Sequence, residues 1–302
     1  MTQWVPRGFE SREAWRRHVL EAGCYDAREN ERIFDKWYAR APRVVFRRAD
    51  AAYGLRGKTV CDVGCGLGVW LSVFKEHGVP EILGMDGDYV DRALLEIDDE
   101  RFLEVDLEQG VPAAGSFDLA VSLEVGEHLP DEAANGFVDG LVALAPAVLF
   151  AAAVPGQGGT RHVNERWPDY WRVHFERHDY VPVDCIRPLI WERSEVRVWY
   201  RQNTILFVAR ALLESNERLR AAHEREGGRP LSVVHPGILE VALERPWRLM
   251  QKLTEELEAG RIDHAEVSER MTRLLKRFAE RARENSELRE PSGRRPPRAA
   301  DQ

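Results

Sequence analysis

The sequence predicts an α/β protein: a parallel sheet covered by helices on both faces, as in doubly wound folds. The first observation is "KTVCDVGCGLG" (58–68), which reads as a short apolar strand running into a glycine-rich turn. The second is a regular alternation of strand-like and helix-like segments that continues to about residue 154. The third is that 117–124 and 147–154 are apolar almost throughout, which is typical of strands buried on both faces.

Each element follows from its spacing. After the first strand, apolar residues at helical intervals predict a helix that Gly78 ends. Beyond it the pattern predicts strands at 81–86, 101–106, 117–124 and 147–154, with helices at 88–97 and 131–144. A further helix is expected within 166–180, and two β-rich runs, 181–185 and 203–210, are placed to close one edge of the sheet.

Helical additions flank this sheet domain. We expect an N-terminal helical segment (1–57), the sheet domain (58–210), a helical appendage (211–284) and a polar, disordered tail (285–302). In the appendage, Pro246 is suited to open one helix and Gly260 to end it. Asp263 with Glu266 resembles a capping box that opens a second helix, so the segment predicts a helical hairpin that packs on its own domain or forms a homodimer contact.

Composition narrows the class of protein. With 302 residues and 44% hydrophobic content, the chain has enough apolar surface for a globular core. Its net charge of −8 argues against a protein that coats nucleic acid, although it does not exclude a local basic patch. No run approaches the ~18 apolar residues of a membrane span, so we expect a cytoplasmic protein. Its four cysteines lack the paired spacing of a zinc site or a disulfide framework.

The glycine loop predicts a ligand site. Gly64, Gly66 and Gly68 follow Asp62 at a strand-to-helix turn, where glycine lets a ligand approach the backbone. The third glycine of a dinucleotide-binding loop is replaced by Val69. The acid at 62 would repel phosphate and favour a ligand that carries an ammonium or sulfonium group.

Two further acids end strands. Asp86 follows the loop by about twenty residues, at a position where a carboxylate accepts from both hydroxyls of a ribose, and Asp106 ends the next strand. Together with "FDLAVSLEVGEHL", these motifs resemble the class I S-adenosylmethionine-dependent methyltransferases over about residues 58–210. The resemblance implies a doubly wound, seven-stranded, mostly parallel sheet with an antiparallel last strand. It also implies S-adenosylmethionine contacts from the following set: Asp62, Gly64, Cys65, Gly66, Gly68, Asp86, Gly87, Asp106, Leu107 and Leu123.

"SLEVGEHLP" (122–130) places two carboxylates and an imidazole at a strand end beside that loop. In one interpretation His128 is a lone general base that Glu127 or Glu124 orients. In the other, these three residues bind a divalent metal, and His162, after the next strand, supplies a fourth ligand. His162 can also be interpreted as a polar loop residue without a ligand role.

The ExxEH motif with a later histidine in "GTRH" is similar to two families: the ubiquinone-pathway O-methyltransferases and the small-RNA terminal 2'-O-methyltransferases. This resemblance implies a divalent metal, Mg, Mn, Fe or Zn, held by Glu124, Glu127, His128 and His162, with Glu127 and His128 catalytic. The metal would grip adjacent oxygens of the acceptor and lower the pKa of a bound hydroxyl.

The acceptor is the least defined part. Trp167, Tyr170, Trp171 and His174 are candidate acceptor contacts, although such an aromatic stripe also suits a core. We expect O-methylation of a small molecule with vicinal hydroxyls, such as a catechol, sugar or nucleoside. The alternatives are methylation of an RNA 3' end, metal-free N- or carboxyl-methylation with His128 as base, and a donor-binding scaffold without catalysis. In such families the N-terminal helices commonly form a lid.

Overall fold

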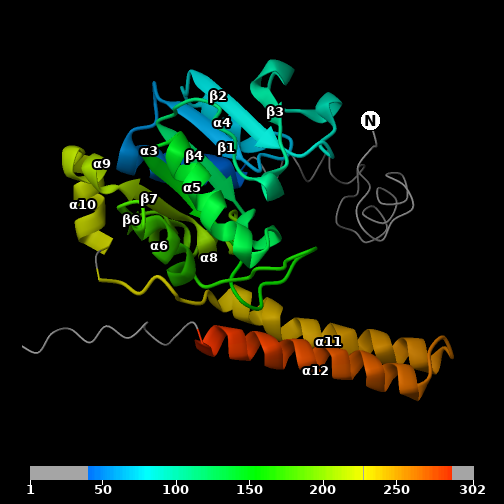
Figure 1. Cartoon of the computed structure of the whole chain (residues 1–302). Coiled ribbons are helices and arrows are strands. Elements are labelled where there is room, and N and C mark those ends of the chain that lie inside the picture. Colours follow the sequence, from blue (N-terminus) through cyan, green and yellow to red (C-terminus); the bar gives the residue numbers. More distant parts are fainter. Residues whose placement is uncertain (1–39, 227, 288–302) are drawn as a thin grey trace, which may run out of the picture.

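In the computed structural model, which describes residues 40–226 and 228–287, the domain is built on one seven-stranded sheet (Figure 1). The strands are β1 (Thr59–Val63), β2 (Glu81–Asp86), β3 (Phe102–Glu104), β4 (Leu119–Leu123), β5 (Ala147–Ala151), β6 (Tyr180–Val183) and β7 (Ile205–Ala209). Their order is β3-β2-β1-β4-β5-β7-β6, and β7 alone runs antiparallel to its neighbours. The predicted fold class and the antiparallel last strand are confirmed.

The strand order reverses between β1 and β4, which lie side by side. In open α/β sheets, ligands bind beyond the carboxyl ends of the strands at such a reversal. The glycine loop follows β1 and Glu124 follows β4. The topology therefore brings the two motifs of the sequence to one place.

Helices cover both faces of the sheet. The longer ones are α3 (Arg40–Tyr53), α4 (Val69–Glu76), α5 (Ala134–Leu144), α6 (Pro168–Glu176) and α10 (Glu217–Glu226), and the shorter ones are α7 (Arg187–Ile190), α8 (Val198–Asn203) and α9 (Arg210–Ser215). One apolar core joins the sheet to α3, α4, α7 and α10. The other joins it to α5 and α6. Helix α3 lies within the expected N-terminal helical segment (1–57) and packs into the first core, whereas residues 1–39 lie outside the described residues, so the expected lid stays a prediction.

The helix expected at 88–97 was wrong. Only a single 3-10 turn forms there, at Arg92–Leu94, and the Asp91 carboxylate caps it by accepting from the Ala93 amide at 3.2 Å. The Glu96 amide then donates to the Leu67 carbonyl at 2.8 Å. The segment is thus held against the glycine loop, where Ile97 is buried. Tertiary contacts overrode the local helical pattern.

The C-terminal helices form the expected hairpin, α11 (Pro236–Glu258) and α12 (His264–Glu287), which extends along one side of the sheet domain (Figure 1). The prediction that Pro246 opens the first helix was wrong. Pro236 occupies the first turn instead, where the His235 ring accepts from the Gly237 amide at 2.9 Å and caps the helix. The Asp263 carboxylate accepts from the Glu266 amide at 2.8 Å, as half of the expected capping box.

The second helix of the hairpin reaches residue 287, so the part of the expected tail beyond it lies outside the described residues. Cys61, Cys65 and Cys185 are buried and unpaired, as expected of small core residues. None of the described helices is long and apolar enough to cross a membrane.

Candidate active site

The glycine loop has the backbone conformation that its sequence requires. Gly64, Gly66 and Gly68 all have positive φ values, of 85°, 54° and 79°, which other residues adopt only with strain. A Cβ added at Gly64 would lie 2.3 Å from the Val125 side chain, so the loop contacts the turn after β4 directly. At Gly66 a Cβ would meet nothing within 4 Å, which leaves that part of the loop open to a ligand.

Two buried acids stand beside this loop. The Asp86 carboxylate accepts from the Gly66 amide at 2.6 Å, from the Gly87 amide at 2.7 Å and from the Tyr89 hydroxyl. Asp62 is also buried, and burial first, then the charge of Asp86, raises the pKa of its carboxyl well above the usual range. Asp62 and Asp86, two of the three predicted acids of the donor site, therefore lie together, and a cationic ligand would stabilise their charge.

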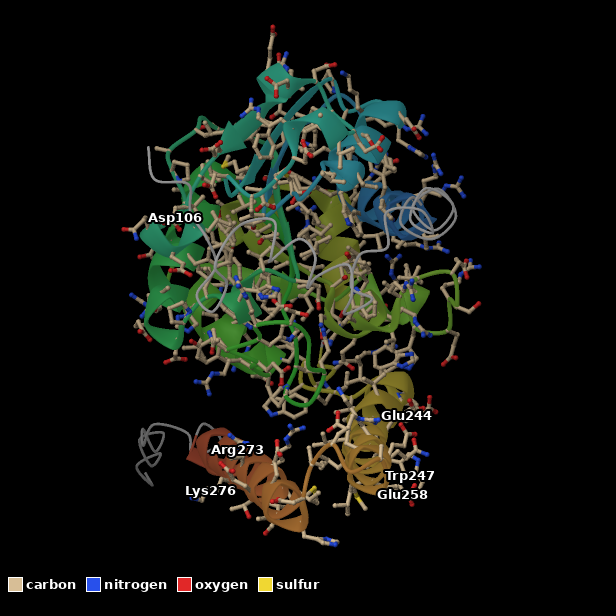
Figure 2. All side chains as sticks on the ribbon, turned by 90° about the vertical axis from the view of Figure 1, so that its right-hand side faces the viewer. Asp106, Glu244, Trp247, Glu258, Arg273 and Lys276 are labelled. Carbon is tan, nitrogen blue, oxygen red and sulfur yellow. The ribbon has the colours of Figure 1, made fainter. Side chains whose placement is uncertain are left out.

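The other predicted donor contacts spread outward from this centre. Leu123 is buried at the end of β4, and Cys65 is buried within the loop. Asp106 is exposed at the periphery of the sheet domain (Figure 2), where it caps a short turn by accepting from the Glu108 amide at 3.0 Å. Leu107, next to it, is half-buried. The expected contacts of Asp106 and Leu107 with S-adenosylmethionine stay a prediction.

Three of the four predicted metal ligands lie together: Glu127 and His128 in the turn after β4, and His162 in the loop after β5. Ligand atoms of Glu127, His128 and His162 all lie within 4.8 Å of one another. The two imidazole rings meet edge to face, 4.9 Å between centroids, and His162 Nε2 lies 3.9 Å from Glu127 Oε1. A carboxylate and two imidazoles form an O/N donor set that suits Mn, Fe or Zn.

Glu127 is fully buried, and neither carboxylate oxygen accepts a hydrogen bond of normal geometry from the described residues, although the Glu124 carboxylate and the backbone at Glu127 and Ala153 lie close to it. A buried carboxylate without partners is costly, because nothing replaces the water it has lost. Burial first, and then the charge of Glu124, raise the pKa of its carboxyl well above the usual range. A bound cation would supply the missing partner, so these residues fit a metal.

Glu124 differs from Glu127 in its surroundings. It adopts a positive φ of 61° at the end of β4. Its carboxylate accepts from Gln157 Nε2 at 2.6 Å and from Asn203 Nδ2 at 2.8 Å, and Asn203 also donates to Gln157 Oε1 at 2.8 Å. These amides already satisfy the Glu124 carboxylate, which lies next to that of Glu127 but is not one of the three clustered ligands. Its role as a metal ligand stays a prediction.

The histidines are suited to coordination. Desolvation first, then repulsion from His162, lower the pKa of His128 to about 4, although the side chain is exposed and water screens part of this effect. A low pKa keeps the ring neutral near pH 7, as a metal ligand must be. The Val163 and Asn164 amides donate to the Glu127 carbonyl at 2.9 and 3.0 Å. The loop that carries His162 is thus bound to the turn that carries the carboxylate.

The predicted acceptor residues pack mainly within the protein. Trp171 is 1% exposed, with its ring 5.0 Å from that of Phe150. The Tyr170 hydroxyl donates to Asp131 at 2.8 Å, and the His174 ring bonds the Asn135 side chain at 2.7 Å. Trp167, at the start of α6, is only half-buried. Trp171 therefore has a core role beneath the Gly126 turn, and an acceptor contact by the other three stays a prediction.

Four residues near the site were not predicted from sequence. Tyr89 bonds Asp86, Gln157 and Asn203 hold Glu124, and Glu165 bonds His162. Tyr89 and Glu165 each lie three residues after a predicted site residue, which is a weak signal. Nothing in the sequence links Glu124 to Asn203, 79 positions away.

Comparison with known proteins identifies the fold as a methyltransferase domain. The model of the methyltransferase domain family matches residues 27–184, just over half of the chain. A search of curated proteins finds no match. CalO1, a methyltransferase in calicheamicin biosynthesis solved in its SAH-bound form, is 20% identical; the alignment covers 66% of this chain and 61% of that one, with a TM-score of 0.45.

Two other solved structures are similar in part. Magnesium protoporphyrin IX methyltransferase from Synechocystis PCC 6803, solved with bound SAH, is 18% identical, with 66% of this chain and 100% of that one covered and a TM-score of 0.43. The small RNA methyltransferase HEN1 is 14% identical, with 55% of this chain covered and a TM-score of 0.40; the match spans only 25% of the HEN1 chain. With its glycine loop, strand-end acids and matched family model, the chain belongs to the methyltransferase domain family and is an S-adenosylmethionine-dependent methyltransferase.

Proposed function

We propose that this enzyme methylates an oxygen atom of a small molecule with vicinal hydroxyls, assisted by a divalent metal ion held by Glu127, His128 and His162. One observation supports the metal in this proposal: the fully buried Glu127 carboxylate lies against a second carboxylate, Glu124, and beside two imidazoles, and neither of its oxygens accepts a hydrogen bond of normal geometry from the described residues. In the lone-base interpretation Glu127 would orient His128 through a hydrogen bond, and none joins these two side chains in the described structure, whereas a cation would compensate the carboxylate charge.

The residues have separate roles in this scheme. The glycine loop and Asp86 hold the donor, and the buried Asp62 carboxylate favours the sulfonium charge. Methyl transfer is an in-line displacement, so the acceptor oxygen must be held opposite the leaving sulfur. When bound, the metal ion would act as a Lewis acid and lower the pKa of a coordinated hydroxyl.

The contact between Gly64 and Val125 sets the two halves of the site side by side. The donor loop and the turn that holds Glu127 meet through this pair, with no intervening element. A vicinal diol offers two adjacent oxygens to a single cation, which fixes the oxygen to be methylated better than one hydroxyl does. The proposed acceptor class follows from this gain in orientation.

The test is a methyl-transfer assay with radiolabelled donor and a panel of acceptors. Each vicinal diol, such as a catechol or a ribonucleoside, is paired with its mono-hydroxyl analogue, and an RNA oligonucleotide with a free 3' end forms a separate arm. We expect turnover of a small vicinal diol, loss of that turnover in EDTA, and its recovery with added Mn²⁺. Asp86→Ala is the donor-site control and should abolish donor binding.

Two results would redirect the proposal. Turnover that is unchanged by EDTA and by Glu127→Gln would leave His128 as a lone base. Turnover of the RNA arm alone would replace the small-molecule acceptor with an RNA 3' end. These tests do not address the expected cytoplasmic location, which stays a prediction.

A further inference from the structure

Glu165 lies in the loop between β5 and α6 and was not among the predicted site residues. Its side chain is only 2% exposed. One carboxylate oxygen accepts from the Gly156 amide at 3.0 Å, and the other accepts from the Gly158 amide at 2.6 Å and from His162 Nδ1 at 3.1 Å. Unlike Glu127, this buried carboxylate is satisfied by donors from its own loop.

The bond to His162 decides which ring nitrogen can coordinate. An ionised carboxylate only accepts, so Nδ1 must carry the hydrogen. In the neutral ring the lone pair then lies on Nε2. Nε2 is the atom that lies 3.9 Å from Glu127 Oε1. The tautomer therefore directs the lone pair of His162 toward the metal-binding cluster.

Gly159 holds the same ring from another side. A Cβ added at Gly159 would lie 2.1 Å from His162 Nε2 and 2.4 Å from Cε1, so the imidazole packs directly on the glycine backbone. The ring is thus fixed by a carboxylate on Nδ1 and by a backbone surface that only glycine provides. Both features belong to the same short loop.

We propose that Glu165 is a positioning residue for the metal: it fixes His162 as the Nδ1–H tautomer and orients Nε2 toward Glu127. The inference rests on the proposed function, because it assigns Nε2 as a metal ligand. Carboxylate partners of ligating histidines set the tautomer and raise ligand basicity, and their loss costs about 10–100-fold in metal affinity. Glu165 itself does not contact the ion.

The experiment separates this role from a purely structural one, in which Glu165 only braces the loop through Gly156 and Gly158. Long-range ¹H–¹⁵N spectra of the full-length, metal-free protein with labelled histidine report each tautomer, and His162→Gln assigns the signal. Wild type should show His162 as the Nδ1–H form. Glu165→Gln should give a tautomer mixture and bind Mn²⁺ about 10–100-fold more weakly by calorimetry.

Glu176→Gln is the matched control, since Glu176 pairs with Arg172 on the surface of α6. This variant should leave the His162 tautomer and the Mn²⁺ affinity unchanged. If Glu165→Gln does not fold, Glu165→Asp is measured instead and should keep the Nδ1–H form, because a charged acceptor remains, with a smaller loss of Mn²⁺ affinity.

An unchanged tautomer together with Mn²⁺ affinity within about twofold of wild type, in whichever variant folds, overturns the inference. If the wild type did not bind Mn²⁺, the metal site of the proposed function would instead be wrong. In that case the His162 tautomer alone, read in the metal-free protein, still decides whether Glu165 fixes the ring.

Discussion

The carboxylate of Glu127 makes the metal-free protein sensitive to pH. Its folded pKa is raised above that of an exposed glutamate, about 4.3, chiefly by burial. The folded state therefore binds the proton more tightly than the unfolded state. The free energy of unfolding thus falls as the pH rises above the pKa of the unfolded glutamate. We expect metal-free Glu127→Gln to be more stable than wild type by about 1–3 kcal/mol at pH 8, with a smaller difference at pH 5.

Urea denaturation in EDTA at the two pH values measures this difference, with Glu176→Gln as a surface control. A gap that is constant between pH 5 and pH 8, or one that grows toward acid pH, would show that Glu127 is not a strained carboxylate. Added Mn²⁺ should stabilise wild type and leave Glu127→Gln unchanged, since the variant lacks the anionic ligand.

Metal affinity should fall steeply on acidification. In the metal-free protein the raised pKa of Glu127 means that a proton competes with the metal for this carboxylate. The lowered pKa of His128, about 4, means that its ring competes little until the solution is strongly acidic. Calorimetry in buffers of different ionisation enthalpy should therefore show proton release on Mn²⁺ binding at pH 6. An affinity that is flat from pH 5 to pH 8 would contradict this assignment.

At the scale of elements, a buried polar network ties the C-terminal hairpin to the sheet domain. The Arg187 guanidinium, 1% exposed, donates to both oxygens of Asp184 at 2.8 and 2.5 Å and to the Leu231 carbonyl at 2.9 Å. Gln202 Oε1 accepts from the His235 amide at 2.5 Å at the start of α11. The network joins α7, α8 and the segment that leads into the hairpin.

Arg187→Met should cost about 3–5 kcal/mol of unfolding free energy, because it leaves Asp184 buried without its partner. Urea denaturation at neutral pH measures the change. Arg210→Met is the matched control, since Arg210 pairs with Asp179 at an exposed site and should cost less than about 1 kcal/mol. Equal losses in the two variants would mean that burial adds nothing to the Arg187 pair.

The sequence predicted the strands well and some helices poorly. Apolar runs that are buried on both faces admit few alternatives, so β4 and β5 lie within the predicted 117–124 and 147–154 and are buried throughout. The segment 88–97 carried a helical pattern, but its hydrogen bond to Leu67 decided its structure. The ExxEH motif likewise predicted the position of Glu127 and His128, whereas Glu165 and Asn203 reach the site through loop geometry that one-dimensional spacing does not contain.

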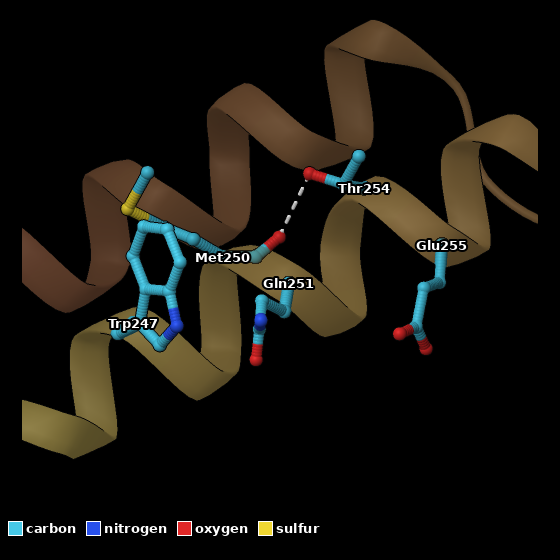
Figure 3. Close-up of a pocket in the computed structure, with 5 residues that line it drawn as sticks. All are labelled: Trp247, Met250, Gln251, Thr254 and Glu255. Atoms are coloured by element: carbon cyan, nitrogen blue, oxygen red, sulfur yellow. Dashed lines mark hydrogen bonds between the residues drawn. The ribbon is translucent and has the colours of Figure 1, made fainter.

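At the scale of the whole molecule, the hairpin exposes an apolar row along α11. Leu239, Leu243, Trp247 and Met250 are 52%, 67%, 60% and 47% exposed. Their spacing of four and three residues keeps them on one helix face. Figure 3 shows Trp247 and Met250 beside a shallow hollow on this face. Such a row suits a helical partner.

We predict that a second copy of the chain covers this row. Figure 2 labels Glu244 and Glu258 on α11, and Arg273 and Lys276 on α12. These opposite charges suit a two-fold pair in which α11 of one copy faces α12 of the other. Sedimentation should show a dimer for wild type and a monomer for Leu243→Lys. Leu94→Lys, at a leucine of the sheet domain that is 60% exposed, should stay dimeric; a monomeric wild type would contradict the pairing.

The measurement that tests the central claim most directly is the metal content of the purified protein after equilibrium dialysis against Mn²⁺. The account predicts one tightly held ion per chain in wild type and none in the Glu127→Ala, His128→Ala double variant. Asp86→Ala, which affects only the donor side, should hold the ion as wild type does. A wild type that retains no ion, or a double variant that retains as much as wild type, would contradict the account.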